Sequence, residues 1–411
     1  MLCLIRLENM IKAQPHVYRC LGFCIFVIMS PSLVYADAFQ IKPTVILEER
    51  FDNNRTMNSE TKDPVYESVI KGNIAFSQRS ATSNLTGSLH ANVNTYYDDG
   101  EFSTNNNQFF RLLWTKKSEL VNWGLHGKYR RDTTVRSIEI DQASEDDQVV
   151  EDFDAGLVQV EFRRNNLKLN PTSGIRINER TGVVFNYNFA TVFYDDNVDG
   201  SGLFNYYQHR VSGGLLRELS ERDSVVANAG AAKFWSEDNV DTTVDSYDLT
   251  AGYRRAFSKT STGAVDVGFR HSSLSSSEQE FSNNGLLVRM SANYRFELSR
   301  IQLAAGHELK PSGSGSLIQV THLNLKAKRK FRERVSGVML LRAFERKSLK
   351  EESEEKKYYL IVEPRVSWRW TRWWAVGAGY KYRKRQEVDS PNDADSHSVF
   401  VSLRYSKKMD I

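Results

Sequence analysis

The chain has 411 residues, of which 26% are charged, and its net charge of +4 is close to balance. Its mean hydropathy is −0.50, and no run after residue 36 approaches the ~18 apolar residues that a membrane helix needs, which argues against a helical membrane protein. Two classes remain: a soluble all-β protein, and a membrane β-barrel in which only alternate residues face lipid. The overall charge says little about partners, and we expect no nucleic-acid partner.

Residues 1–36 have the features of a secretory signal peptide. Arg6, Lys12 and Arg19 carry positive charge, residues 21–29 form a short apolar core, and Val34-Tyr35-Ala36 resembles a cleavage site with small residues at both ends. An apolar core of this length is too short to span a membrane. We therefore predict a signal peptide over residues 1–36 and a single exported domain over residues 37–411.

All the cysteines of the chain, Cys3, Cys20 and Cys24, lie inside the predicted signal. None of them is placed as a lipid-acceptor cysteine would be, so we expect no lipid anchor. An exported domain without disulfides needs another source of stability, and a closed hydrogen-bonded sheet would supply it.

The mature chain reads as a series of long strands with alternating apolar and polar residues. The first is predicted over residues 39–51, and hairpins follow over 66–77 with 85–97 and over 109–115 with 121–133. The last is predicted over residues 398–405 and ends in an aromatic residue, Tyr405. Two stretches are less regular: residues 98–107 are predicted as a polar loop, and residues 152–179 as one irregular or bulged strand.

Connections between the strands fall into two classes that alternate along the chain. Tight turns are predicted near Arg180, Glu221, Lys259, Ser299, Arg332 and Arg372, and longer loops rich in Asp, Glu, Ser and Asn lie between them. Outer-membrane barrels have short periplasmic turns and longer outer loops. The alternation predicts a transmembrane antiparallel up-and-down β-barrel of about 18 strands, with 16 as the alternative count and both termini in the periplasm.

One face of the predicted strands is apolar and is expected to contact lipid. Its aromatic residues gather near strand ends, where rings with a polar tip favour the membrane interface. The densest group is Trp368, Trp370, Trp373 and Trp374, around one tight turn. A soluble sandwich core is the alternative, but such long strands without helices are unusual in soluble domains.

The opposite face is polar, contains more basic than acidic residues, and is predicted to line the lumen. Such a lumen would attract anions; alternatively, the charges only pair across strands and hold the wall together. The acidic residues are Asp248, Asp266, Glu308 and Glu363. The basic residues are Lys71, Arg111, Lys128, Arg130, Arg254, Arg270, Arg289, Arg295, Lys326, Lys328, Arg365, Arg369, Lys381, Arg383 and Arg404.

No motif in the chain predicts an enzyme. The histidines show no metal-ligand spacing, and no Gly-x-Ser-x-Gly elbow is present. A hydrolase assembled from scattered residues is the alternative, because triads are defined by geometry. The Asp-rich strand ends at 51–54, 96–99 and 194–197 fit turns better than calcium sites. We expect no cofactor, no metal and no catalytic residue.

Several short motifs resemble a family of outer-membrane β-barrels that accompany exosortase/PEP-CTERM and exopolysaccharide gene clusters. They are Phe39-x-Ile41-x-Pro43 with Phe51-Asp52-Asn53-Asn54, Leu169-Asn170-Pro171 with Asn178-Glu179-Arg180-Thr181, and Phe193-Tyr194-Asp195-Asp196-Asn197. The resemblance covers the whole mature chain and brings no catalytic residues. It implies a Gram-negative outer-membrane protein associated with polysaccharide production.

Together these features predict an outer-membrane channel for exopolysaccharide export, with a basic lumen that favours an anionic polymer. Its expected partners are outer-membrane lipid, an anionic polysaccharide and periplasmic secretion components. Two alternatives remain: a general small-solute porin, and a structural or adhesive barrel whose loops do the work.

Overall fold

The computed structural model describes residues 38–410 except 61, 63, 99–100, 134–161, 196–202, 238–241, 278–279, 312–316, 350–355 and 389–392. The predicted signal peptide and its cysteines lie outside these residues. No helix within the described ranges is long and apolar enough to cross a membrane.

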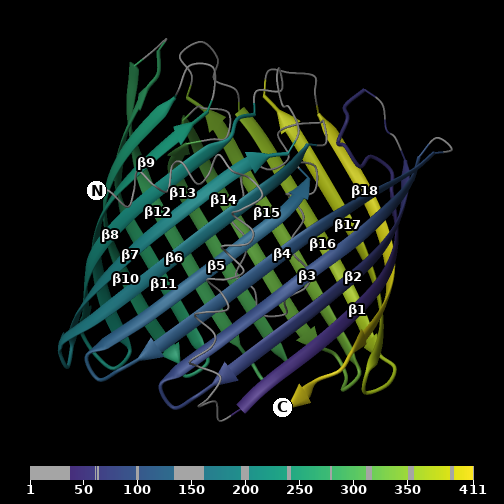
Figure 1. Cartoon of the computed structure of the whole chain (residues 1–411), viewed down its shortest axis with the longest axis horizontal. Helices are drawn as coiled ribbons and strands as arrows, with labels where there is room; N and C mark the ends of the chain where they lie inside the picture. The colour runs from purple at the N-terminus through teal and green to yellow at the C-terminus, as the bar shows by residue number, and fades with distance from the viewer. Residues whose placement is uncertain are drawn as a thin grey trace.

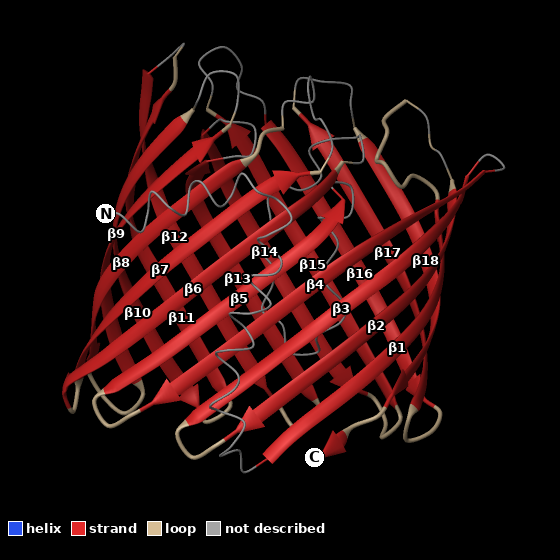
Figure 2. Cartoon of the chain, in the orientation of Figure 1, coloured by secondary structure: helices blue, strands red, loops and turns tan. Residues whose placement is uncertain are grey.

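Eighteen long strands follow one another along the chain (Figures 1 and 2). They are 13 to 17 residues long, which exceeds the ~9–11 residues that a tilted strand needs to cross a bilayer. The bounds are β1 Ala38–Asp52, β2 Val65–Arg79, β3 Ser83–Asp98, β4 Glu101–Lys117, β5 Val121–Thr133, β6 Arg163–Asn178, β7 Thr181–Tyr194, β8 Tyr206–Glu218, β9 Asp223–Ser236, β10 Thr243–Ser258, β11 Ser261–Ser275, β12 Glu280–Arg295, β13 Ser299–Pro311, β14 Leu317–Lys330, β15 Val335–Ser348, β16 Lys356–Arg369, β17 Trp374–Glu387 and β18 Ala394–Ser406.

The strands form one closed antiparallel sheet. Each strand pairs with its neighbours in the chain, and β1 pairs with both β2 and β18, from Asp52 opposite Ser398 to Thr44 opposite Ser406. A short final strand, β19 (Met409–Asp410), adds to β1 beyond the end of β18. Closure removes the unpaired edges that an open sheet would expose. The predicted up-and-down barrel of 18 strands is confirmed, and the count of 16 is wrong.

The two ends of the barrel differ, as the alternating connections predict. Turns of two to four residues, such as 80–82, 179–180 and 370–373, join strands at one end, which we call the tight-turn end. The wider connections lie at the opposite, long-loop end, where only the connections at 99–100 and 276–279 are as short as the tight turns. The start of β1 and the short β19 both lie at the tight-turn end, because Ala38 pairs with Arg79 and Gln40 with Asp410 (Figure 1).

The polar loop predicted over residues 98–107 is wrong, because β4 begins at Glu101. The strands β3 and β4 stay paired up to Asp98 opposite Glu101. Asn105 and Asn107 fall on the inner side of this hairpin, opposite Asn94 and Asn92 of β3. A polar composition therefore did not indicate a loop here, because the backbone hydrogen bonds of the hairpin need no apolar side chains.

The single strand predicted over residues 152–179 is confirmed for its described part as β6. Its pairing with β7 keeps one register from Arg164 to Arg176, even across Pro171, which has no N–H to donate. The register shifts only between Arg176 and Asn178, at the tight turn. The predicted irregularity therefore lies at the end of the strand. Residues 152–161 are outside the described ranges.

The two faces of the sheet are reversed relative to a soluble protein. In β1, the outward side chains of Val45 and Leu47 are 45% and 47% exposed, whereas the inward Glu48 and Arg50 are 2% and 6% exposed. The last strand repeats this pattern, with Val399 and Val401 outward at 53% and 57%. Water-exposed apolar stripes on every side of a closed sheet would be costly, so this outer surface suits lipid. The soluble-sandwich alternative is wrong.

Candidate functional site

The inner wall of the barrel is the candidate functional site, because it gathers polar side chains from every strand. Side chains opposite each other in a ladder point to the same face. Ile46 lies opposite Lys71, and Lys71 lies opposite Asn92, so these residues share the face of the inward Glu48. Arg111 likewise lies opposite Lys128, so these two side chains point to the same face.

The predicted lumen cations all fall on this inner face. They differ in environment, from nearly buried to open to solvent. The buried ones are Lys71, Arg130, Arg270, Lys381 and Arg383; half-buried are Arg111, Lys128, Lys326, Lys328, Arg365 and Arg404, and exposed are Arg254, Arg289, Arg295 and Arg369. Their role in passing anions stays a prediction.

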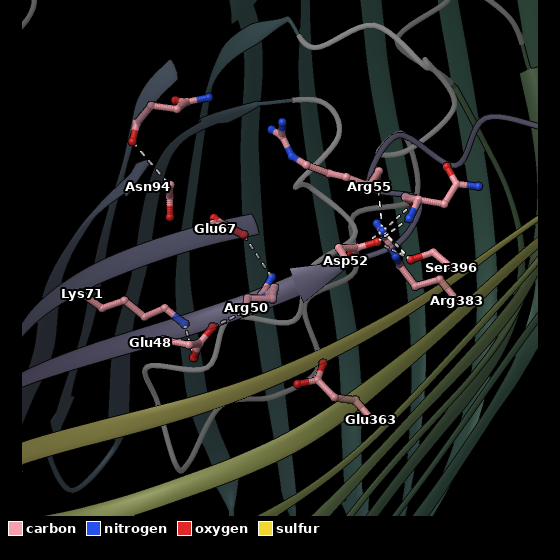
Figure 3. A network of polar contacts seen from close by, with 12 residues as sticks. Glu48, Arg50, Asp52, Arg55, Glu67, Lys71, Asn94, Glu363, Arg383 and Ser396 are labelled. Carbon is pink, nitrogen blue, oxygen red and sulfur yellow. Dashed lines mark hydrogen bonds and ion pairs between the residues drawn. The ribbon is translucent and has the colours of Figure 1, made fainter. Parts of the chain in front are cut away.

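Glu48 is the centre of a buried ion cluster on β1 and β2 (Figure 3). Arg50 donates from Nη2 to Glu48 Oε1 at 2.7 Å, and Lys71 donates from Nζ to Glu48 Oε2 at 2.8 Å. Arg50 Nη1 also lies 3.8 Å from Glu67 Oε2. Every side chain of this cluster is less than 10% exposed. Charges buried this deeply need partners, since an uncompensated one is very costly.

A second network fastens the connection between β1 and β2 to the inner wall (Figure 3). Arg383 on β17 donates from Nη2 to Asp52 Oδ2 at 2.9 Å, to the backbone oxygens of Asn54 at 3.1 Å and Arg55 at 3.2 Å, and to Ser396 Oγ at 2.9 Å. The Arg55 guanidinium stacks 3.9 Å above the ring of Tyr96 on β3. The described part of this connection is therefore held against both β17 and β3, at the long-loop end.

Two more carboxylates on the inner face each contact two arginines. Asp132 contacts Arg130, and it accepts from Arg164 Nε at 3.1 Å. Asp248 accepts from Arg210 at 2.5 Å and 2.7 Å, and Arg270 Nη2 lies 3.4 Å away. The pairing predicted as an alternative is thus present. It still leaves a surplus of positive charge, because each of these carboxylates has two cationic neighbours.

Part of the inner wall is open to solvent rather than packed. The side chain of Arg289 on β12 is 51% exposed although it contacts Glu308 Oε2 at 3.3 Å. Arg210, on the same side of the barrel, is 23% exposed. A guanidinium half open to water on the inside of a closed sheet indicates an aqueous space at that height.

Apolar clusters on the inner wall near the long-loop end were not predicted. One is formed by Ile318, Val320, Phe344 and Tyr359, and the other by Phe234, Val244, Leu274, Leu309 and Leu317. Other missed inner residues are cations: Arg50, Arg164, Arg210, Arg342, Arg346 and Arg385. Strand parity would have found these cations, and it also places Ile318, Val320 and Phe344 on the inner face. Leu309 and Leu317 are different, because each has the parity of the outward residues of its strand.

The predicted interface tryptophans surround the tight turn 370–373. Trp368, Trp370 and Trp374 are 48%, 58% and 39% exposed, and the Arg372 guanidinium lies 4.7 Å from the centre of the Trp373 ring. Their contact with membrane headgroups stays a prediction.

Exposed basic residues are concentrated around the tight-turn end. Adjacent pairs occur on several turns and strand ends: Lys116 with Lys117, Arg254 with Arg255, Arg329 with Lys330, and Lys407 with Lys408. Exposed glutamates lie on some of the same turns, among them Glu119, Glu221 and Glu333, so the basic residues are in excess but do not form a ring of one sign. An excess of positive charge at the mouth of a low-dielectric tube raises the local concentration of anions.

The described residues contain no group of three or more His, Cys, Asp or Glu side chains that could hold a metal. At one Asp-rich strand end, Asp52 accepts from the backbone N–H of Asn54 at 3.0 Å, which is an Asx turn. At another, Asp195 Oδ2 accepts from Arg131 at 2.5 Å. These two carboxylates are used in contacts within the protein, since Asp52 also accepts from Arg383.

No protein-family model matches this chain, and no curated protein matches it. Among solved structures, it is similar to a BenF-like porin from Pseudomonas fluorescens Pf-5, with a TM-score of 0.47, 8% identity, and 91% and 100% of the two chains covered. It is also similar to OccK5 (OpdH) of Pseudomonas aeruginosa, with a TM-score of 0.45, 8% identity, and 91% and 99% covered. Because the TM-scores are below 0.5 and the identities are 8%, these similarities carry no argument about function. The inferences below rest on the inner and outer faces of this chain.

Proposed function

We propose that this protein is an outer-membrane channel whose positively charged lumen passes anions, with an anionic exopolysaccharide as its cargo. The observation that carries the proposal is the charge of the inner wall. Glu48, Asp132 and Asp248 are each contacted by two cations, and further cations such as Arg289 are open to solvent. A low-dielectric tube with this surplus favours anions over cations.

In the proposed orientation, the tight-turn end and both termini face the periplasm. The basic residues around that end would then meet an anionic polymer before it enters the barrel, and periplasmic secretion components would have access to both termini. The apolar outer face, with Val45 and Leu47 as examples, would contact lipid.

A small-solute porin is the second candidate, and the long-loop end favours it. The connection between β1 and β2 is tied inward by Arg383, and two apolar clusters line the wall at that end. Both features take up space inside the barrel, which favours a small solute over a polymer.

Single-channel recording on the purified protein in planar bilayers tests the proposal. An anion-selective reversal potential under a salt gradient is expected, together with block of the current by an anionic polysaccharide added on the side of the tight turns. Cation selectivity would contradict the proposed lumen. Passage of small anions without any block by the polymer would favour the porin.

A further inference from the structure

A cavity of about 480 Å³ lies in the inner wall at the tight-turn end. It is lined by β1, β2, β3, β4 and β18, so it crosses the seam where the first strand meets the last. Its volume is within the ~300–1,000 Å³ of sites that hold small molecules. It lies apart from the Arg383 network, which is at the other end of the barrel.

The cavity is positively charged. Among the side chains that the structure describes, the charged ones that line it are Lys42, Lys71, Arg111, Arg404 and Lys408, all of them cations. Glu48 offsets part of this charge from behind, through its contact with Lys71 at 2.8 Å. The other four cations come from β1, from β4, and from β18 and the residues just after it. They therefore line the cavity from several sides. A cavity of this kind favours a ligand with a negative charge.

Neutral hydrogen-bonding groups fill the gaps between the cations. Hydroxyl groups come from Thr44, Ser77, Thr86, Ser88 and Ser406, and Thr44 Oγ1 lies 3.0 Å from Ser406 Oγ. Asn73 also lines the cavity, and its buried Oδ1 has no hydrogen-bond partner. A hydroxyl group donates and accepts, so such a wall suits a ligand with several hydroxyls of its own.

Apolar side chains form a large part of the wall: Ile41, Ile46, Ala75, Phe76 and Leu113. A ligand that matches all three properties carries one carboxylate, several hydroxyls and an apolar C–H face. A uronic acid residue of a polysaccharide has these groups, whereas a simple inorganic anion has only the charge.

We propose that this cavity binds a uronate sugar, with Arg111 and Arg404 facing the carboxylate from opposite sides and the hydroxyl groups contacting the ring. The site rests on the proposed function for its biological meaning: it would be the first subsite that an acidic polymer meets when it enters from the tight-turn end. Its binding chemistry does not require the channel to conduct.

Calorimetric titration of the detergent-purified protein tests the site, with sodium glucuronate as the probe and glucose and acetate as comparison ligands. Glucuronate should bind at least tenfold more tightly than either, because glucose lacks the charge and acetate lacks the hydroxyls. Glucuronate binding no tighter than acetate or glucose overturns the proposal, and so does equal binding of sulfate.

Variants locate the site. Lys42→Gln combined with Arg404→Gln should weaken glucuronate binding at least tenfold, whereas Arg254→Gln, which removes an inner cation on β10 at the same end, should change it less than twofold. Equal losses of glucuronate affinity in the double variant and in Arg254→Gln would overturn the proposed location of the site. If the double variant does not fold, Lys408→Gln is the second variant, since it removes an exposed cation of the cavity outside the long strands. It should weaken glucuronate binding severalfold, and unchanged binding would overturn the proposed location of the site.

The two proposals fail separately. Glucuronate binding without conductance would contradict the channel and leave this site intact. Conductance with no preference for glucuronate would contradict the site and leave the channel intact.

Discussion

Replacing Glu48 by Gln should destabilise the barrel strongly, although the two side chains have nearly the same shape. Glu48 is 2% exposed and is contacted by Arg50 at 2.7 Å and Lys71 at 2.8 Å. Without the carboxylate, Arg50 and Lys71, which are both buried, lose the anion that they share, and Glu67 lies 3.8 Å from Arg50. Removing one partner of a buried ion cluster costs about 3–5 kcal/mol. The water of the lumen screens part of this, so we expect about 3 kcal/mol.

The assay is reversible urea unfolding in phospholipid vesicles, followed by tryptophan fluorescence. Lys71→Met in the same chain should recover part of the loss, because it removes one of the two cations that Glu48 contacts. The matched control is Lys62→Ala, which breaks the exposed pair with Asp395 at 2.8 Å, 51% and 36% exposed, and should cost less than about 1 kcal/mol. A loss for Glu48→Gln no larger than for this control would refute the reasoning.

Three further predictions concern the outer face, the fastened connection and the charge of the lumen. Leu249→Arg places a charge on an outward position that is 66% exposed, near the middle of β10. It should lower the free energy of unfolding in vesicles by about 2–4 kcal/mol. The same change at Leu219, in a tight turn, should lower it by about 0–1 kcal/mol. Arg383→Met removes the Nη2 group whose two hydrogens are shared by four acceptors, so a protease should cut residues 53–60 faster. The outward Lys384→Met should leave the cleavage rate unchanged, and equal rates in the two variants would contradict the role of Arg383. Arg289→Gln should shift the reversal potential toward less anion selectivity, and an unchanged potential would show that this cation does not face the permeating ions.

The sequence alone determined the class of fold and the facing of most residues, for one physical reason. The side-chain period of a strand is two, and a slip of one residue exchanges the faces, so alternation identifies the face wherever the two faces meet different solvents. Lys71, Arg111 and Lys381 therefore fall on the inner face on which parity placed them. The alternation of tight turns and long loops likewise predicted about 18 strands, and the closed sheet decided between 18 and 16.

Only the tertiary structure decided what the inner side chains contact. Asp52 and Arg383 are 331 positions apart and meet only because β1 closes on β18 beside β17. The uronate cavity crosses the same seam, with Lys42 on one side and Arg404 on the other. No local pattern records such neighbours, because closure sets the stagger between strands that are distant in the chain. Prediction from the sequence also missed the apolar clusters on the inner face and the start of β4 at Glu101. Composition alone predicts neither, because the neighbouring strands determine where these residues lie.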